Sequence, residues 1–246
     1  MRILLLGGTT EAAAMARALA GAGVDAIFSY AGRTAAPASQ PLPMRIGGFG
    51  GAEGLAAFLR AEGITHLIDA THPFAARISA NAVRAADATG AALIALQRPP
   101  WQAQRGDRWT MVSDIAAAAR ALPKAPSRVF LAIGRQNLDA FAGQPQHHYL
   151  LRLVDPPGAL PLRNATVEIA RGPFTVTADA ALMARHGTQI VVAKNAGGAG
   201  ARAKLDAARD ALLPVIMIDR PALPTRSIAA TVDEVMRWLH SARRGV

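Results

Sequence analysis

The first hundred residues alternate between short apolar runs and longer segments whose apolar positions recur at helical spacing. The short runs are almost continuously apolar, as in strands of a parallel sheet that is covered on both faces. The predicted strands occupy 2–8, 24–30, part of 44–51, 65–70 and 91–96. The predicted helices occupy 9–23, 52–63 and 73–90. Strands alternating with helices of this length indicate βαβ units and a doubly wound sheet.

Residues 98–109, RPPWQAQRGDRW, interrupt this alternation with prolines and charges and form our candidate linker. The alternation then resumes and continues to the last helix, predicted at 231–244, without a residue-level repeat of the first half. We therefore expect an α/β protein with two Rossmann-like domains, 1–98 and 99–246, each a doubly wound parallel sheet, and a cleft between them. The last helix could instead pack back on the first domain.

Composition fits a folded protein outside the membrane. Of the 246 residues, 51% are hydrophobic and 18% are charged, which argues against disorder. The chain has no cysteine, so disulfides and thiolate metal sites are excluded. No apolar stretch approaches the roughly 18 residues of a membrane span. We expect a cytoplasmic protein.

The formal net charge of +10 has two explanations. Only three of the basic residues, Lys124, Lys194 and Lys204, are lysines, so a codon bias toward arginine would account for it. An anionic partner would account for it equally well. Because the arginines are dispersed and aromatic residues make up only 5%, a small anionic ligand is favoured over nucleic acid.

Candidate chemistry is sought at the carboxyl ends of the strands, where open α/β sheets bind ligands. The first end reads LLLGGTTEA. Gly7 and Gly8 permit a tight turn and a close backbone approach, and Thr9, Thr10 and Glu11 open a helix whose amides suit phosphate oxygens. Because this is not the GxGxxG fingerprint, an ordinary turn remains an equal alternative.

The second strand end favours NADP over NAD. It reads FSYAGRT, so Ser29, Tyr30, Gly32 and Arg33 stand where an acid would hold the ribose 2′-hydroxyl of NAD. A hydroxyl with an arginine suits a 2′-phosphate, which a carboxylate would repel. A solvated loop arginine is the alternative.

Two further strand ends have unusual composition. GGFGG places Phe49 and Gly50 in a loop whose backbone would pass close to a flat ligand. DATHPFA places Pro73 at the first position of a helix, which puts Thr71 or His72 at the helix N-terminus. Thr71, like Gly50, is a candidate for binding the cofactor. His72 is our candidate proton donor or orienting group, since an ordinary histidine titrates near pH 6.5. A capping turn with an internally bonded histidine is the alternative.

In the second half, AIGRQN and AKNAGG each place a basic residue beside an amide at a strand end. Such loops suit carboxylates or phosphates, although solvated loops would look the same. The candidates for binding the substrate are Phe49, Arg77, Arg135, Asn137, Lys194, Asn195 and Lys204. The dispersed histidines show no metal-ligand spacing, so no metal site is predicted.

The chain resembles the precorrin-6A reductases in an ordered set of motifs that runs over almost its whole length. The motifs are LLLGGTTE, SYAGRT, RIGGFGG, IDATHPFA with the following IS, RPPW, AIGRQN, AKNAGG with a later AK, and VIMIDRP. The resemblance implies reduction of a ring carbon–carbon double bond of precorrin-6A by NADPH to give precorrin-6B in cobalamin biosynthesis. Hydride transfer and protonation would be the chemical steps. One departure is Ala196, where many relatives have serine.

The resemblance also implies the partners. The cofactor would be NADPH, bound by the first domain, and the substrate a tetrapyrrole with several carboxylates, either metal-free or containing cobalt. Handover of the pigment to neighbouring cobalamin-pathway enzymes would fit, and nucleic acid and membrane are not expected. Two alternatives stay open: an NADP-dependent reductase of another small anionic molecule, and a non-catalytic module that senses NADP or binds nucleic acid. The Tyr-x-x-x-Lys pair of short-chain reductases is absent.

Overall fold

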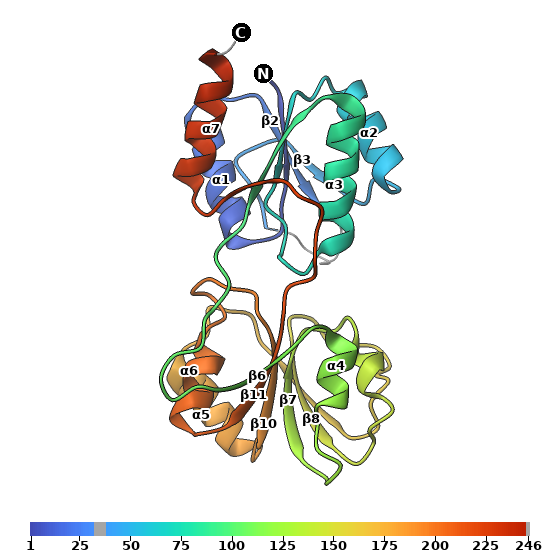
Figure 1. Ribbon diagram of the computed structural model, residues 1–246, viewed down its shortest axis with the longest axis vertical. Coiled ribbons are helices and arrows are strands. Elements are labelled where there is room, and N and C mark those ends of the chain that lie inside the picture. The colour runs from blue at the N-terminus through green and yellow to red at the C-terminus, as the bar shows by residue number, and fades with distance from the viewer. Residues whose placement is uncertain (32–37, 245–246) are drawn as a thin grey trace. The chain divides into compact units, whose positions relative to one another are not determined.

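The computed structural model describes residues 1–31 and 38–244 and divides into two compact units (Figure 1). Unit 1 combines Met1–Pro99 with Ala222–Val246, and unit 2 is Pro100–Pro221. We expected the second domain to continue to residue 246, with the last helix as the part that could return. The chain instead passes back into unit 1 after Pro221. A short strand then joins the edge of the first sheet, and the last helix packs on that sheet.

Unit 1 is a six-stranded sheet in which every neighbouring pair is parallel, in the order β12-β5-β4-β1-β2-β3. Its strands are β1 (Ile3–Leu6), β2 (Ala26–Tyr30), β3 (Met44–Ile46), β4 (His66–Asp69), β5 (Ala92–Leu96) and β12 (Ser227–Ala229). Its helices are α1 (Thr10–Gly21), α2 (Ala52–Ala61), α3 (Ala76–Thr89) and α7 (Val232–Arg244). Figure 1 shows helices on both faces, which confirms the doubly wound fold predicted for this part of the chain.

Unit 2 is a second parallel six-stranded sheet, in the order β6-β11-β10-β7-β8-β9. Its strands are β6 (Arg108–Val112), β7 (Arg128–Ala132), β8 (His148–Leu153), β9 (Ala165–Ile169), β10 (Ile190–Lys194) and β11 (Pro214–Ile218). Its helices are α4 (Ile115–Arg120), the 3-10 helix η1 (Leu138–Phe141), α5 (Val176–Arg185) and α6 (Ala203–Asp210). The two-domain α/β fold class is therefore confirmed.

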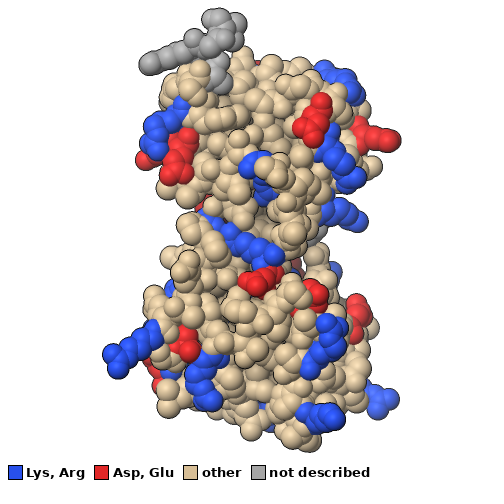
Figure 2. All heavy atoms as spheres, viewed as in Figure 1, with Lys and Arg blue, Asp and Glu red and all other residues tan. Residues whose placement is uncertain are grey.

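Charged side chains are dispersed over the surface seen in Figure 2. On this face of each unit, arginine and lysine side chains stand among acidic and uncharged ones and form no continuous basic stripe. Among the described residues, no helix is long and apolar enough to cross a bilayer.

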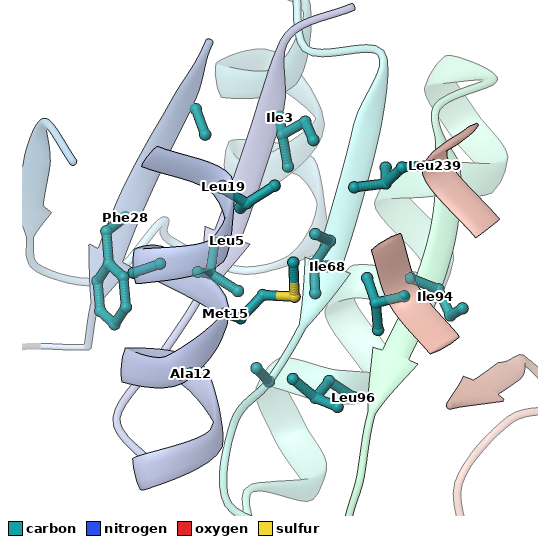
Figure 3. Close-up of a cluster of buried hydrophobic side chains, with 14 of the residues drawn as sticks. Ile3, Leu5, Ala12, Met15, Leu19, Phe28, Ile68, Ile94, Leu96 and Leu239 are labelled. Atoms are coloured by element: carbon teal, nitrogen blue, oxygen red, sulfur yellow. The ribbon is translucent and has the colours of Figure 1, made fainter. Parts of the chain in front are cut away.

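Strand β1 lies between two apolar cores. Ile3 and Leu5 enter the cluster that includes Met15 of α1 and Leu239 of α7 (Figure 3). Leu4 and Leu6, which point to the other face of the sheet, enter the opposite cluster with side chains of α2 and α3. All four strand residues are at most 2% exposed, as the continuous apolar run predicted. Packing of α7 against the first cluster explains why the last helix belongs to unit 1.

Several details differ from the predicted pattern of strands and helices. Strand β12 was not predicted. The candidate linker 98–109 ends inside strand β6, which begins at Arg108. Where the resumed alternation would place a helix after β7, the structure has only the short 3-10 helix η1.

Candidate functional site

The first candidate site lies at the carboxyl edge of the unit 1 sheet. Strand β1 pairs with β2 on one side and β4 on the other, in register from Ile3 to Leu6. The chain therefore winds away from β1 in one direction through β2 and β3, and in the other through β4 and β5. Open α/β sheets bind ligands beyond the carboxyl ends of the strands at such a point of reversal. The segments predicted to bind NADP follow β1, β2, β3 and β4 and meet at this edge.

The turn after β1 admits only glycine at its first position. A Cβ atom on Gly7 would lie 2.0 Å from Cζ of Phe28, and Gly8 has a φ of +120°. Thr9 then caps α1, because its Oγ1 accepts a hydrogen bond from a first-turn N–H at 3.0 Å. The same hydroxyl donates to the Ala70 carbonyl at 2.8 Å, which joins the loops after β1 and β4. The N-terminal turn of α1 therefore faces the ligand edge, an arrangement that suits a phosphate.

Glu11, in the first turn of α1, is paired with an arginine that the sequence had not singled out. Nη1 of Arg98 lies 2.6 Å from Oε2 of Glu11, and the Thr10 hydroxyl donates to the same oxygen at 3.1 Å. Burial alone would raise the pKa of Glu11, but a hydrogen bond from its own backbone amide and the charge of Arg98 hold that pKa below its ordinary value. The carboxylate is ionised and its charge is compensated.

Candidates from two strand ends lie around one narrow gap that is too small to hold a water molecule. Its wall consists of Thr9, Glu11, Thr71, Pro73, Leu96, Gln97 and Arg98. The structure thus brings the predicted residues of the β1 and β4 loops together. It adds Gln97 and Arg98, which directly follow β5.

Ser29, at the end of β2, has a cationic neighbour on the adjacent strand. Its hydroxyl is buried and accepts a hydrogen bond from Nη1 of Arg45, on β3, at 3.3 Å. The same guanidinium donates to the carbonyls of Gly47 and Gly48 at 2.7 and 2.8 Å. Partial burial lowers the pKa of Arg45 below its ordinary value, and the guanidinium stays charged at neutral pH. Sequence reasoning missed Arg45, although it precedes the glycine loop within RIGGFGG.

The other residues predicted after β2 divide into two groups. Gly32 and Arg33 lie outside the described residues. The hydroxyl of Tyr30 donates to the Ala38 carbonyl at 3.0 Å and accepts from Nε2 of Gln40 at 2.7 Å. Tyr30 thus holds residues 38–40 through its hydroxyl.

Phe49 anchors the glycine loop after β3. Its ring lies edge-on to Phe58 of α2, with centroids 5.2 Å apart, and packs against the core beneath α2 and α3. The guanidinium carbon of Arg45 lies 3.8 Å from the centroid of the Phe49 ring. Gly50 and Gly51 follow with φ of +78° and +106°, which glycine adopts readily. A contact of Phe49 or Gly50 with a ligand stays a prediction.

Thr71 and His72 lie in a turn that the buried end of β4 holds. Asp69 is 3% exposed, and its Oδ1 accepts hydrogen bonds from the Thr71 N–H at 3.1 Å and the Thr71 hydroxyl at 2.6 Å. His72 is exposed, and its Nδ1 accepts a hydrogen bond from the Phe74 N–H at 3.2 Å. Because the accepting nitrogen is unprotonated, the neutral ring carries its proton on Nε2.

The helix after this turn begins later than predicted. We expected Pro73 in its first turn, with Thr71 or His72 at its N-terminus, but α3 begins at Ala76. The N–H of the residue before the helix donates to the His72 carbonyl at 2.7 Å and closes a separate tight turn. Arg77, a predicted substrate residue, is exposed in the first turn of α3.

Unit 2 has a corresponding reversal point between β7 and β10. Strands β8 and β9 lie beyond β7, and strands β11 and β6 lie beyond β10. Arg135 and Asn137 follow β7 and are exposed, whereas Lys194 ends β10 and is half-buried. These three predicted residues therefore belong to neighbouring strand ends at one edge of the sheet. Their chemistry suits carboxylates.

Asn195 and Lys204 have internal partners. Asn195 is 4% exposed, and its amide accepts from the Trp101 N–H at 2.7 Å and donates to the Trp101 carbonyl at 3.0 Å. Lys204, in the first turn of α6, is 5% exposed, donates to the Ala201 carbonyl of the loop before the helix, and lies 5.3 Å from the Trp101 ring. Arg220, which sequence reasoning missed, donates to the Asn195 carbonyl at 3.0 Å and to the next carbonyl at 3.1 Å. These side chains build the loop after β10.

Comparison with known proteins identifies the family. A family model described as precorrin-6x reductase CbiJ/CobK matches residues 2–240. The chain belongs to this family. The precorrin-6A reductase of Rhodobacter capsulatus is 64% identical, over 100% of this chain and 99% of the relative. That of Mycobacterium tuberculosis H37Rv is 44% identical, over 96% and 95%.

A solved structure of a CobK precorrin-6A reductase agrees with the fold of this CbiJ/CobK family member. It superposes with a TM-score of 0.94 at 63% identity and covers 98% of this chain and 96% of that one. Both units of this family member therefore belong to the shared architecture. The resemblance drawn from the ordered motifs is confirmed.

Proposed function

We propose that the chain is an NADPH-dependent precorrin-6A reductase of cobalamin biosynthesis. Hydride transfer to one carbon of a ring double bond, with protonation of its neighbour, would give precorrin-6B. The full-length identity of 64% to a precorrin-6A reductase is the observation that carries the reaction. The arrangement of the unit 1 edge supports the cofactor.

The residues at the unit 1 edge fit a dinucleotide. Gly7 has no room for a Cβ atom, and Gly8 has a positive φ, so the backbone can approach a pyrophosphate closely. The N-terminal turn of α1, capped by Thr9, would bind the pyrophosphate charge. NADPH, when bound there, supplies the hydride. Because Arg98 neutralises Glu11, the carboxylate does not stand as an uncompensated charge beside the phosphates.

The 2′-phosphate would lie beyond the end of β2. Ser29 supplies a hydroxyl there, and Arg45 supplies a guanidinium that the Gly47 and Gly48 carbonyls hold beside it. A fixed guanidinium is a strong partner for a phosphate. Arg33, three residues beyond Tyr30, is proposed from the sequence as a second cation.

The substrate carboxylates would be bound by cationic side chains. Arg135 and Lys194 at the unit 2 edge, with Asn137, offer one group, and exposed Arg77 of α3 offers another. Asn195 and Lys204 would act by holding the loop that follows Lys194. His72 would deliver the proton as the imidazolium, in which Nδ1 gives up the hydrogen bond that it accepts from the Phe74 N–H in the neutral ring.

The pattern of identities favours the metal-free substrate. Relatives named precorrin-6A reductase are 64%, 50%, 48% and 44% identical to this chain. Relatives named cobalt-precorrin-6A reductase are 30%, 29% and 27% identical. We therefore propose precorrin-6A without cobalt as the natural substrate.

The test is NADPH oxidation by the purified protein with metal-free or cobalt-containing precorrin-6A, followed by mass spectrometry of the pigment. We expect oxidation that depends on the metal-free substrate and a product heavier by two hydrogens. Oxidation with the cobalt form alone would overturn the substrate assignment. Tight NADPH binding without turnover of either pigment would overturn the reaction but leave the cofactor.

A further inference from the structure

A buried ion pair connects the returning segment of the chain to the end of β4. Arg226 directly precedes β12, and its side chain is 6% exposed. Its Nη2 lies 3.6 Å from Oδ2 of Asp69, whose side chain is 2% exposed. The same Nη2 donates a hydrogen bond to Oε1 of Gln97 at 3.1 Å. Arg226 therefore contacts side chains at the carboxyl ends of both β4 and β5.

Asp69 divides its two oxygens between different partners. Oδ1 accepts both hydrogen bonds from Thr71, through its N–H and its hydroxyl, while Oδ2 faces Arg226. The Thr71 hydroxyl also lies 3.4 Å from Oγ of Ser79, which is buried in α3. A continuous polar network thus runs from Arg226 through Asp69 to the turn that carries Thr71 and His72.

Charge compensation is the main interaction of Arg226. Among the described residues, its Nε and Nη1 have no hydrogen-bond partner, so the guanidinium is not held by a set of backbone carbonyls. A buried carboxylate is costly unless an opposite charge compensates it. Without Arg226, the buried Asp69 carboxylate would lose the opposite charge beside it and would draw away from its position. Its hydrogen bonds to Thr71 would then change.

We infer that Arg226 is a positioning residue for the reduction. Its charge holds the Asp69 carboxylate in place, Asp69 fixes Thr71, and the fixed turn presents Thr71 and His72 to the reacting groups. This inference rests on the proposed function. The network borders the loop after β1 through the Ala70 carbonyl, which accepts from Thr9, but its side-chain contacts end at the turn that carries His72, the proposed proton donor. We therefore expect Arg226 to act more on kcat than on the KM for NADPH.

The experiment compares four variants of the full chain. Arg226→Gln removes the charge, Arg226→Lys keeps it, and Asp69→Asn/Arg226→Gln removes both members of the pair. Arg84→Gln is the matched control, because Arg84 is an exposed arginine of α3 that donates to Asn81 in its own helix. The readouts are hydrogen exchange of the Thr71 amide in the cofactor-free protein, and kcat and KM with precorrin-6A and NADPH.

For Arg226→Gln we expect Thr71 exchange at least about tenfold faster and kcat at least about tenfold lower, with KM for NADPH within about threefold. Arg226→Lys and the double variant should each regain at least about threefold in kcat over Arg226→Gln. Arg84→Gln should match the wild type. If Arg226→Gln fails to fold, the lysine and double variants decide.

Three results would overturn the inference. They are normal Thr71 exchange in Arg226→Gln, a loss that appears in KM and kcat equally, and a double variant no better than Arg226→Gln. The lysine and double variants alone can also decide. The inference is overturned if, in both, Thr71 exchange is at least about tenfold faster or kcat is at least about tenfold lower than in the wild type. The exchange measurement needs no turnover. A wild type that does not reduce precorrin-6A would therefore refute the proposed function separately from the Arg226–Asp69–Thr71 network.

Discussion

Replacing Arg45 tests whether the β2–β3 edge reads the 2′-phosphate of the cofactor. Arg45→Gln removes the guanidinium beside Ser29 and should weaken NADPH binding while leaving NADH binding nearly unchanged. The reason is that NADH has no phosphate at this position. Arg45→Lys keeps the charge but not the planar donor fork, and should give an intermediate loss.

The magnitude follows from the geometry. The guanidinium already lies 3.3 Å from the Ser29 hydroxyl, so a phosphate bound beside Ser29 would be within direct reach. A hydrogen bond between charged groups contributes about 1.5–3 kcal/mol. That corresponds to roughly a 10- to 150-fold loss in NADPH affinity. The full Coulomb attraction of about 4 kcal/mol at 4 Å is an upper limit, because Arg45 is only partly buried.

The assay is titration calorimetry of NADPH and NADH on the wild type, Arg45→Gln and Arg45→Lys. Arg60→Gln is the control, because Arg60 lies on α2 of the same unit and donates to the Ala88 carbonyl. An equal loss for both cofactors would refute the reasoning. It would mean that Arg45 matters only for the glycine loop, through the Gly47 and Gly48 carbonyls.

Three further predictions concern the same edge. Gly7→Ala should lower the free energy of unfolding in urea by about 1–3 kcal/mol, because its Cβ would lie 2.0 Å from Phe28; unchanged stability would contradict this packing. His72→Ala should lower turnover more than about tenfold and leave the NADPH Kd within about twofold, and near-normal turnover would remove the proton-donor role. Glu11→Gln should be less stable than the wild type above pH 4.5, the ordinary pKa, and the difference should vanish as pH falls through the lowered folded pKa. A difference that grows in acid would show that the ion pair with Arg98 has the opposite effect.

The sheet architecture could be predicted because it depends on local patterns. Strand β1 is a continuous apolar run, and the structure buries it on both faces. The helix after it begins at Thr10 behind a threonine cap, as its sequence indicates. Repetition of such strand–helix units along the chain is sufficient for two doubly wound parallel sheets.

The return of the chain to unit 1 could not be predicted in this way. Strand β12 has only three residues, and Ile228 at its centre is 62% exposed because the strand lies at the sheet edge. It follows a proline-rich segment and has no alternating pattern. Its pairing with β5 is a tertiary interaction between distant parts of the sequence.

For the site, the sequence predicted residue types but not their partners. Asn195 was selected for its amide, yet that amide binds the backbone of Trp101, 94 residues away. Arg45 was missed because only the register of β2 and β3 places it beside Ser29. Hydrogen bonds between distant segments decide whether a polar side chain is available for a ligand.

The central claim is direct hydride transfer from NADPH to precorrin-6A. It is tested by turnover with NADPH carrying deuterium at the reactive nicotinamide carbon, in one stereoisomer and then the other, with mass spectrometry of the pigment. We predict that one stereoisomer transfers its deuterium to precorrin-6B. With unlabelled NADPH in heavy water, the neighbouring carbon should instead receive a deuterium from the solvent. A reduced pigment without deuterium from either stereoisomer would contradict the account.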